Sequence, residues 1–247
     1  MRGLAALALA FSLALLAFSP CRAAEMQLSK GMTHYARDME FYYQKPRPEV
    51  LPGLLRTLAT QGVLGHGEKR LVVAAFLGEL AAKRKASLEA LADGAESLPG
   101  GAAADARRTL AWAAHLGGFS NERQLLDRLL TPADSTLRAH MGRSPAPLAA
   151  WQPGEPAVPR MFWGAYMASG DAVWLDRLID ATLSYARLNA AGRQGEAGFA
   201  GSAAAAALLY DMAPRHAAVQ ERVRTRLAGT SGPEADTLRL ILRENGR

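Results

Sequence analysis

Residues 50–62 have the sequence VLPGLLRTLATQG, and this stretch carries the pattern that decides the fold. Its large apolar residues recur at spacings of three and four, so one face of an α-helix would collect them. Pro48 precedes the stretch at a position where a first helical turn tolerates proline. Gly62 ends it, as glycines commonly do after a helix. The stretch therefore predicts an amphipathic helix with one buried face.

The same helical spacing recurs along most of the chain. Further apolar stripes lie in residues 71–80, 88–98, 103–116, 125–130, 160–169, 171–183, 199–212, 217–227 and 231–242. Residues that favour strands are scarce, with eight valines, two isoleucines and ten threonines, whereas a pleated sheet needs such residues. We therefore predict an all-α fold of about ten short helices in stacked antiparallel pairs, either an irregular α-solenoid or a helical bundle.

Local capping signals mark several predicted helix ends. Thr131 is placed to cap a short helix. Gly170 is expected to end one helix in a left-handed conformation, and Asp171 to cap the next. Ser231 and Glu234 have the spacing of a capping box, in which each side chain accepts a hydrogen bond from the other residue's backbone. Because Asp171 has this structural role, we do not predict a catalytic one.

The N-terminus has the three regions of a secretory signal. Arg2 provides a positive start, and residues 4–18 form a 15-residue apolar run, shorter than the roughly 20 residues that span a bilayer. Small residues permit cleavage after Ala23 or Ala24. We predict a signal peptide over residues 1–23 and a mature helical domain over 24–247, in the periplasm or outside a bacterial cell. The alternative is an uncleaved membrane anchor.

Composition limits the classes of partner. The formal net charge of +6 falls to +4 when Arg2 and Arg22 leave with the signal. This modest charge is scattered through the helices and makes a nucleic-acid partner improbable for an exported protein. Cys21 is the single cysteine and leaves with the signal, so the mature domain is predicted to have no disulfide. Because the apolar run of residues 4–18 also leaves with the signal, we predict no stable membrane span after cleavage.

Residues 142–159 interrupt the helical pattern. Seven prolines and glycines lie within these 18 residues, a density that marks a loop or linker. The segment either divides the mature chain into two subdomains or wraps one surface of a single domain.

No catalytic or metal-binding motif stands out in the chain. The five histidines have no HExxH spacing, which would place two metal ligands on one helix face. The nucleophile elbow of hydrolases and the glycine-rich phosphate loops are also missing. We therefore predict no metal, no cofactor and no catalytic residue.

Two aromatic clusters provide the candidate binding residues. The first contains Tyr42 and Tyr43, and the second contains Trp163 and Tyr166 among small residues. Aromatic rings with a polar group suit binding sites, but large rings against small residues also suit a seam between packed helices. The four rings are our candidate contacts for a protein or peptide partner in the envelope, and core packing is the alternative.

Glu40 supports a different function. A carboxylate beside two tyrosines could be the acid of an aromatic cleft that cleaves a cell-envelope glycan. Such catalysis usually needs a second carboxylate or a positioned water. A glycan hydrolase that uses Glu40 is therefore the alternative function.

Two segments resemble signatures of a family of exported bacterial helical proteins. They are FYYQKPRPEVLPGLLRTL at residues 41–58 and FWGAYMASGD at residues 162–171. The resemblance implies export and a helical fold, and it implies no activity. The rhythm of helix pairs is loosely similar to HEAT and tetratricopeptide arrays, which usually bind proteins or peptides. By this analogy we expect an exported binding or scaffold protein.

Overall fold

The protein is described by a computed structural model over residues 35–83 and 86–243. Within these residues it has twelve α-helices, eleven of them with seven or more residues, and no strand. The predicted all-α fold is therefore confirmed, and the predicted signal peptide lies outside the described residues. Helix α3 (Tyr35–Glu40) belongs to a first unit of the chain, and the other helices belong to a second, compact unit that begins at Phe41.

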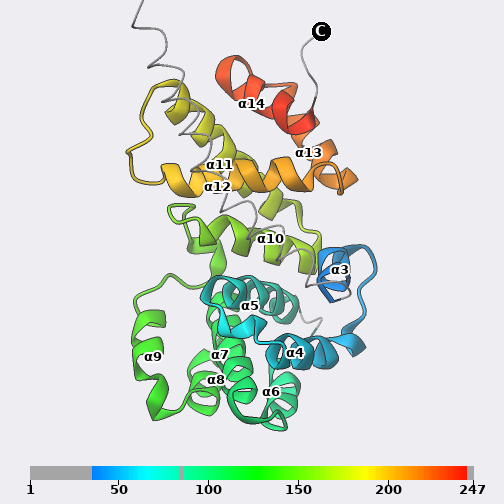
Figure 1. Cartoon of the computed structure of the whole chain (residues 1–247), viewed down its shortest axis with the longest axis vertical. Helices are drawn as coiled ribbons and strands as arrows, with labels where there is room; N and C mark the ends of the chain where they lie inside the picture. The colour runs from blue at the N-terminus through cyan, green and yellow to red at the C-terminus, as the bar shows by residue number, and fades with distance from the viewer. Residues whose placement is uncertain (1–34, 84–85, 244–247) are drawn as a thin grey trace, which may run out of the picture. The chain divides into compact units, whose positions relative to one another are not determined.

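The helices of the second unit are short and follow one another closely (Figure 1). They are α4 (Leu51–Thr60), α5 (Gly67–Ala82), α6 (Leu88–Glu96), α7 (Gly100–Gly117), α8 (Glu122–Leu129), α9 (Ser135–Met141), α10 (Ala157–Ser169), α11 (Ala172–Ala190), α12 (Phe199–Met212), α13 (Ala217–Leu227) and α14 (Gly232–Leu242). Five 3-10 turns join them, namely η1 (Tyr42–Gln44), η2 (Pro48–Val50), η3 (Val63–Gly65), η4 (Pro132–Asp134) and η5 (Leu148–Ala150).

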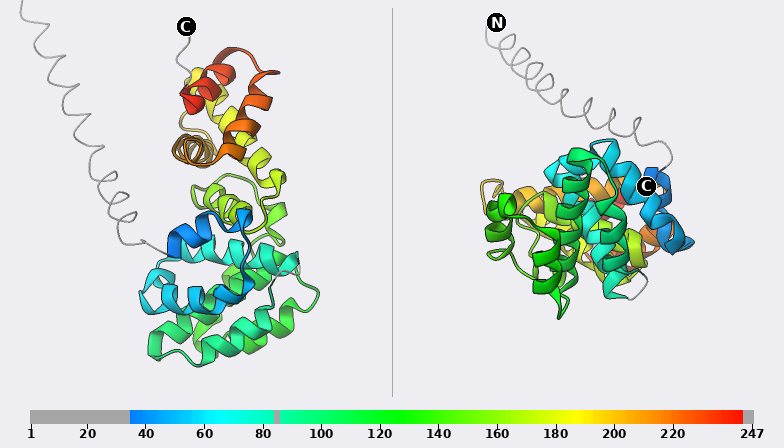
Figure 2. Two further views of the ribbon diagram at one scale, coloured as in Figure 1. Left: turned by 90° about the vertical axis from the view of Figure 1, so that its right-hand side faces the viewer. Right: turned by 90° about the horizontal axis from the view of Figure 1, so that it is seen from below.

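Helix α10 connects two groups of packed helices. On one side it packs along α5, which in turn packs along α7. On the other side it contacts α11 and α12, and α11 also contacts α13 and α14. The ribbon shows α10 between α5 and α12 in two perpendicular views (Figure 2). Helix pairs thus form the fold, as the sequence predicts.

Helix α5 is buried on every side over most of its length. All positions from Val73 to Ala81 are buried, including the charged Glu79. The predicted stripe included Leu71 and Val72, but both keep partial exposure. The buried surface is wider than a stripe because helices contact α5 from more than one direction, and small residues leave room for them.

Two of these helix contacts require glycine. A Cβ on Gly164 of α10 would lie 2.5 Å from the backbone oxygen of Val72, and one on Gly78 would lie 2.7 Å from the oxygen of Ala113. Real Cβ atoms do not approach backbone oxygens so closely. Glycine therefore lets α5 lie against both α10 and α7 at the density typical of protein cores.

Most of the predicted helix ends are confirmed. Gly170 has φ +69° at the end of α10, and the Asp171 carboxylate accepts a hydrogen bond of 3.2 Å from the Val173 N–H. Thr131 forms a capping box with Asp134 at η4. The capping box predicted at Ser231 is wrong, because the Ser231 side chain makes no cap.

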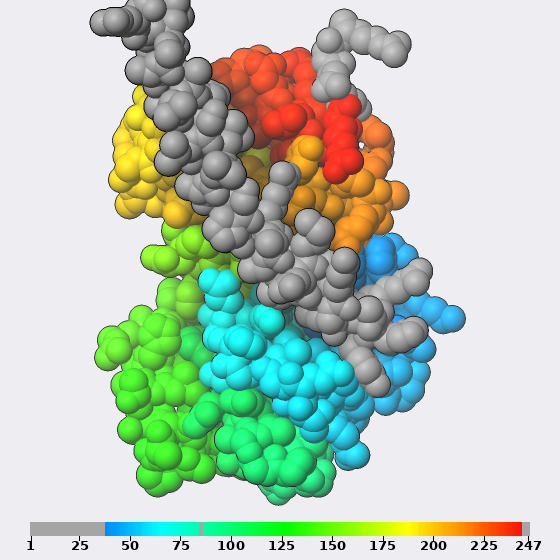
Figure 3. All heavy atoms as spheres, viewed as in Figure 1, coloured from blue at the N-terminus to red at the C-terminus, as the bar shows by residue number. Residues whose placement is uncertain are grey.

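The carboxylate of Glu234, the other partner of that predicted box, instead accepts from Arg187 of α11. This ion pair belongs to a row that we call the α11 ion-pair row. Its other members join α11 to α13, as Asp176 pairs with Arg222 and Asp180 pairs with Arg226. The side chains of the row are partly exposed, and α14 lies at the surface of the molecule in the space-filling view (Figure 3). Charged contacts thus connect α11 to the last two helices.

Candidate functional site

The four predicted binding residues lie in two elements of the compact unit. Tyr42 and Tyr43 form η1, whereas Trp163 and Tyr166 lie on α10. Tyr42, Trp163 and Tyr166 are only 2%, 6% and 1% exposed, and Tyr43 is partly exposed. The structure therefore places three of the four rings in the core, while their binding role stays a prediction.

Two of these rings, Tyr43 and Trp163, contact a histidine that the sequence does not single out. His216, just before α13, is fully buried. Its ring lies 4.9 Å from that of Trp163 in an edge-on arrangement, and its Nδ1 lies 3.1 Å from the Tyr43 hydroxyl. Tyr43 also packs 4.9 Å from Tyr166. We call Tyr43, Trp163, Tyr166 and His216 the aromatic cluster.

The aromatic cluster brings together parts of the chain that are far apart in sequence. Tyr43 and His216 are 173 positions apart, so no local pattern could reveal the contact. Burial, together with the hydrogen bond to Tyr43, raises the pKa of Tyr166, which therefore stays neutral. The contacts of these rings join η1 and the residue before α13 to α10.

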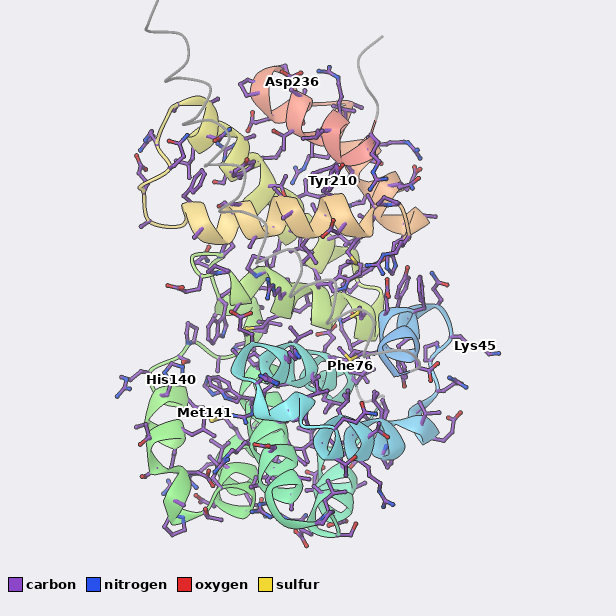
Figure 4. The ribbon with its side chains drawn as sticks, viewed as in Figure 1. Lys45, Phe76, His140, Met141, Tyr210 and Asp236 are labelled. Carbon is purple, nitrogen blue, oxygen red and sulfur yellow. The ribbon has the colours of Figure 1, made fainter. Side chains whose placement is uncertain are left out.

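Tyr42 points elsewhere. Its ring packs edge-on against Phe76 of α5, with centroids 5.2 Å apart. Phe76 lies among the helices, whereas Lys45 points away from the ribbon (Figure 4). Burial raises the pKa of the Tyr42 hydroxyl above its ordinary value. The two neighbouring tyrosines thus anchor η1 to different helices.

A pocket of about 460 Å³ lies along one face of α11. Helix α11 contributes Arg177, Asp180, Ala181, Ser184 and Arg187 to its lining. The remaining lining residues are Phe162 of α10 and the loop residues Gln152 and Pro153. We call this site the α11 pocket. Phe162 is the neighbour of the predicted contact Trp163 in the sequence, whereas the charged residues of α11 are not among the predicted contacts.

The sequence does contain a signal for this face of α11. Residues 177, 180, 184 and 187 recur at spacings of three and four, which places polar side chains on one side of a helix. Such a polar stripe usually faces solvent. Only the folded chain shows that the loop of residues 142–156, which we call the Pro-rich loop, lies across this face of α11 and forms a pocket.

Arg177 fixes the loop wall of the α11 pocket. Its guanidinium donates to the backbone oxygens of Ala149 and Trp151, the second at 3.0 Å. The same group lies over the Phe162 ring, 5.2 Å from its centroid, within the range of a cation–π contact. The arginine thereby joins the loop to both α10 and α11.

The start of α12 supports the same wall from the other side. A Cβ on Gly201 would lie only 2.0 Å from the Pro153 oxygen, so glycine is needed for this close approach. The indole Nε1 of Trp151 donates to the Pro145 oxygen at 2.6 Å within the loop. The wall of the pocket is thus anchored at several points.

Two of the three charged residues that line the α11 pocket form ion pairs within the described part of the chain, and the third does not. Asp180 pairs with Arg226, and Arg187 pairs with Glu234. Arg177 pairs with backbone oxygens and, among the described residues, with no carboxylate. The pocket therefore carries one positive charge that no ion pair neutralises.

The other sites considered from the sequence add little. Glu40 ends α3 in the first unit, and its role in a hydrolase stays a prediction. Within the described residues, no group of three or more His, Cys, Asp or Glu side chains is placed to hold a metal ion. None of the helices described there is both long and apolar enough to cross a membrane.

Asp171 has a second contact besides its capping bond. Lys83, at the end of α5, donates to its carboxylate at 3.0 Å. The Val173 N–H and this lysine both lower the pKa of Asp171. The residue thus caps α11 and joins it to α5, which agrees with the structural role predicted for it.

Comparisons with known proteins identify no family for this chain. No family model matches it, and no curated protein or solved structure is significantly similar. The resemblance to exported bacterial helical proteins and the likeness to HEAT and tetratricopeptide arrays therefore stay predictions.

Proposed function

We propose that this protein is exported by a bacterial cell and acts in the envelope as a non-catalytic binding or scaffold protein for a protein or peptide partner. The α11 pocket carries the proposal. Its volume of about 460 Å³ lies within the usual range for ligand sites, about 300–1,000 Å³. Its loop wall is anchored by Arg177 and by the close approach of Gly201 to Pro153. A pre-formed site binds with less loss of conformational freedom.

Tyr43 supports the proposal as a second contact. It is the one predicted ring that keeps partial exposure, and its hydroxyl accepts a hydrogen bond of 3.0 Å from the exposed Gln44. Its other contacts fix it against Tyr166. A rigid ring with a partly exposed face suits contact with a partner.

Site-specific cross-linking of the full-length, exported protein tests this function. A photo-reactive residue replaces Ser184 in the α11 pocket, or Tyr43 in the aromatic cluster, in cells that produce the protein. We expect a discrete cross-linked partner from at least one position, identified by mass spectrometry. The control position is Gln124, an exposed residue of α8.

The outcome depends on the difference between these positions. A partner captured at Ser184 or Tyr43 but not at Gln124 supports the proposed function. Equal capture at all three positions, or capture at none, contradicts it.

Export is tested on the same material. We expect an N-terminus at Ala24 or Glu25 in the periplasmic or secreted fraction, as measured by mass spectrometry. Intact Met1 in the membrane fraction would instead support the uncleaved anchor.

A further inference from the structure

We propose that the α11 pocket binds a carboxylate group, carried by a small organic acid or by the C-terminus of a peptide, and that Arg177 supplies the charge that attracts it. This inference rests on the proposed binding function and specifies its ligand class.

The charges that line the pocket favour an anion. Asp180 and Arg187 each have a partner of opposite charge on α13 or α14. Their fields therefore largely cancel at the pocket. Arg177 contacts neutral backbone oxygens and an aromatic ring, so its charge remains. The pocket thus favours a single anion over a cation or a neutral ligand.

The shape of the arginine side chain favours a carboxylate among anions. A guanidinium has five N–H donors in one plane, and two of them donate to the oxygens of Ala149 and Trp151. The remaining N–H groups belong to the same guanidinium, which these two hydrogen bonds hold in place at the pocket. A planar fork of this kind matches a carboxylate in two parallel hydrogen bonds.

Two neutral polar residues, Ser184 and Gln152, also line the pocket. The Ser184 hydroxyl accepts a hydrogen bond of 3.3 Å from Arg187, which leaves its own proton to donate to a ligand. The side chain of Gln152 lines the pocket from the loop. Both residues are neutral, so the preference for a charged ligand comes from Arg177.

Binding of matched acids and amides to the full mature protein tests the proposal. The small probes are phenylacetate and phenylacetamide, and the peptide probes are one acetylated peptide with either a free or an amidated C-terminus. Affinities are measured by calorimetry. We expect at least one acid to bind about tenfold or more tightly than its amide, because a charged hydrogen bond is lost in the amide. The pair that shows the preference identifies the source of the carboxylate.

Two pocket variants and one control assign the binding to Arg177. Arg177→Gln should weaken acid binding by about tenfold or more, and should weaken amide binding less, so that the preference for the acid is lost. Asp180→Asn should strengthen acid binding, because it removes a negative charge and releases Arg226. The matched control is Arg128→Gln, which removes an arginine that pairs with Asp93 and Glu96 away from the pocket. It should leave the acid affinity unchanged.

The results separate this inference from the proposed function. Equal binding of acid and amide in both pairs, or no binding of any probe, overturns the carboxylate site. If Arg177→Gln folds, unchanged affinity for the acid overturns the carboxylate site as well. If Arg177→Gln does not fold, unchanged affinity of Asp180→Asn for the acid overturns it instead. A partner cross-linked at Ser184 alongside any of these results retains the binding function and rejects its ligand class. Carboxylate binding without a cross-linked partner retains the carboxylate site and rejects the binding function for a protein or peptide partner.

Discussion

Helices α5 and α11 both contact α10, but the contacts that stabilise them differ in kind. Apolar side chains and backbone surround α5, with glycines at the points of closest approach. Helix α11 has one apolar face, and it meets α13 and α14 partly through the α11 ion-pair row. Close packing is sensitive to added volume, whereas exposed ion pairs are sensitive to salt. One fold therefore contains two regions that should respond to different perturbations.

The largest expected effect is at the seam between α5 and α10. Gly164→Ala places a methyl group 2.5 Å from the Val72 oxygen, and such overpacking costs about 1–3 kcal/mol of unfolding free energy. The control is Gly53→Ala in α4, where a Cβ meets nothing within 4 Å. It should raise stability by up to about 1 kcal/mol. Urea unfolding measures both, and similar effects of the two variants would show that the seam is not closely packed.

A buried carboxylate provides an effect of comparable size. Asp134 is 7% exposed and accepts hydrogen bonds from Arg108 at 2.6 Å and from the Thr131 hydroxyl at 2.8 Å. Asp134→Ala should lower the unfolding free energy by about 1.5–3 kcal/mol, because these charged hydrogen bonds are lost. Thermal or urea unfolding at neutral pH measures it. If Asp134→Ala lowers the unfolding free energy by no more than about 1 kcal/mol, the usual upper value for an exposed ion pair, this buried carboxylate contributes no more than the exposed ones do.

The same carboxylate gives this effect a pH dependence. Burial raises the pKa of Asp134, but the hydrogen bonds from Arg108 and Thr131 outweigh it, so the pKa lies below its ordinary value. Its contribution to stability is therefore present above the unfolded-state pKa, about 3.9, and is lost as pH falls through the lower folded-state value. The wild type and Asp134→Ala should accordingly converge in stability in strong acid.

A smaller effect on stability is expected where Asp171 of the α11 cap contacts Lys83 at the end of α5. Asp171→Ala removes both the cap of α11 and the contact with Lys83 of α5, and loss of such a cap costs about 0.5–2 kcal/mol. Thermal unfolding of the two proteins gives the difference. Unchanged stability together with loss of a cross-linked partner would make Asp171 a functional residue instead.

The smallest effect is expected in the α11 ion-pair row. A double-mutant cycle on Arg187 and Glu234 should give a coupling energy of about 0.2–1 kcal/mol, the usual value for exposed pairs. The coupling should fall towards zero in about 1 M salt, where the screening length is roughly 3 Å. A coupling that persists in high salt would mean that this region also depends on buried contacts.

Sequence reasoning succeeded where a residue acts on its own neighbours. The helix ends at Gly170 and Asp171, and the cap at Thr131, depend on local backbone geometry and were predicted correctly. Glu234 was misassigned because a long side chain can choose between its own helix end and Arg187, a choice that tertiary packing decides. The wide burial of α5 was also missed, since alanines and glycines show no stripe before neighbouring helices are known.

The candidate site was less predictable for the same reason. The sequence marks Tyr43, Trp163 and Tyr166 by their chemistry alone. It does not reveal that His216, 173 positions after Tyr43, contacts both Tyr43 and Trp163. Arg177 belongs to a polar helix face that, in sequence, is indistinguishable from an ordinary solvated one. It becomes part of a pocket only because the Pro-rich loop lies across α11.

The burial of α5 also has a consequence for the motions of the folded chain. Its backbone amides from Val73 to Ala81 are covered by α7 and α10 as well as by their own helix. Hydrogen exchange at these amides requires both neighbours to separate, so its rate reports the opening of the whole unit. Helix α14 contacts α11, α12 and α13 on one side, and its Leu240 is 61% exposed on the other. We therefore expect the amides of α14 to exchange faster than those of α5.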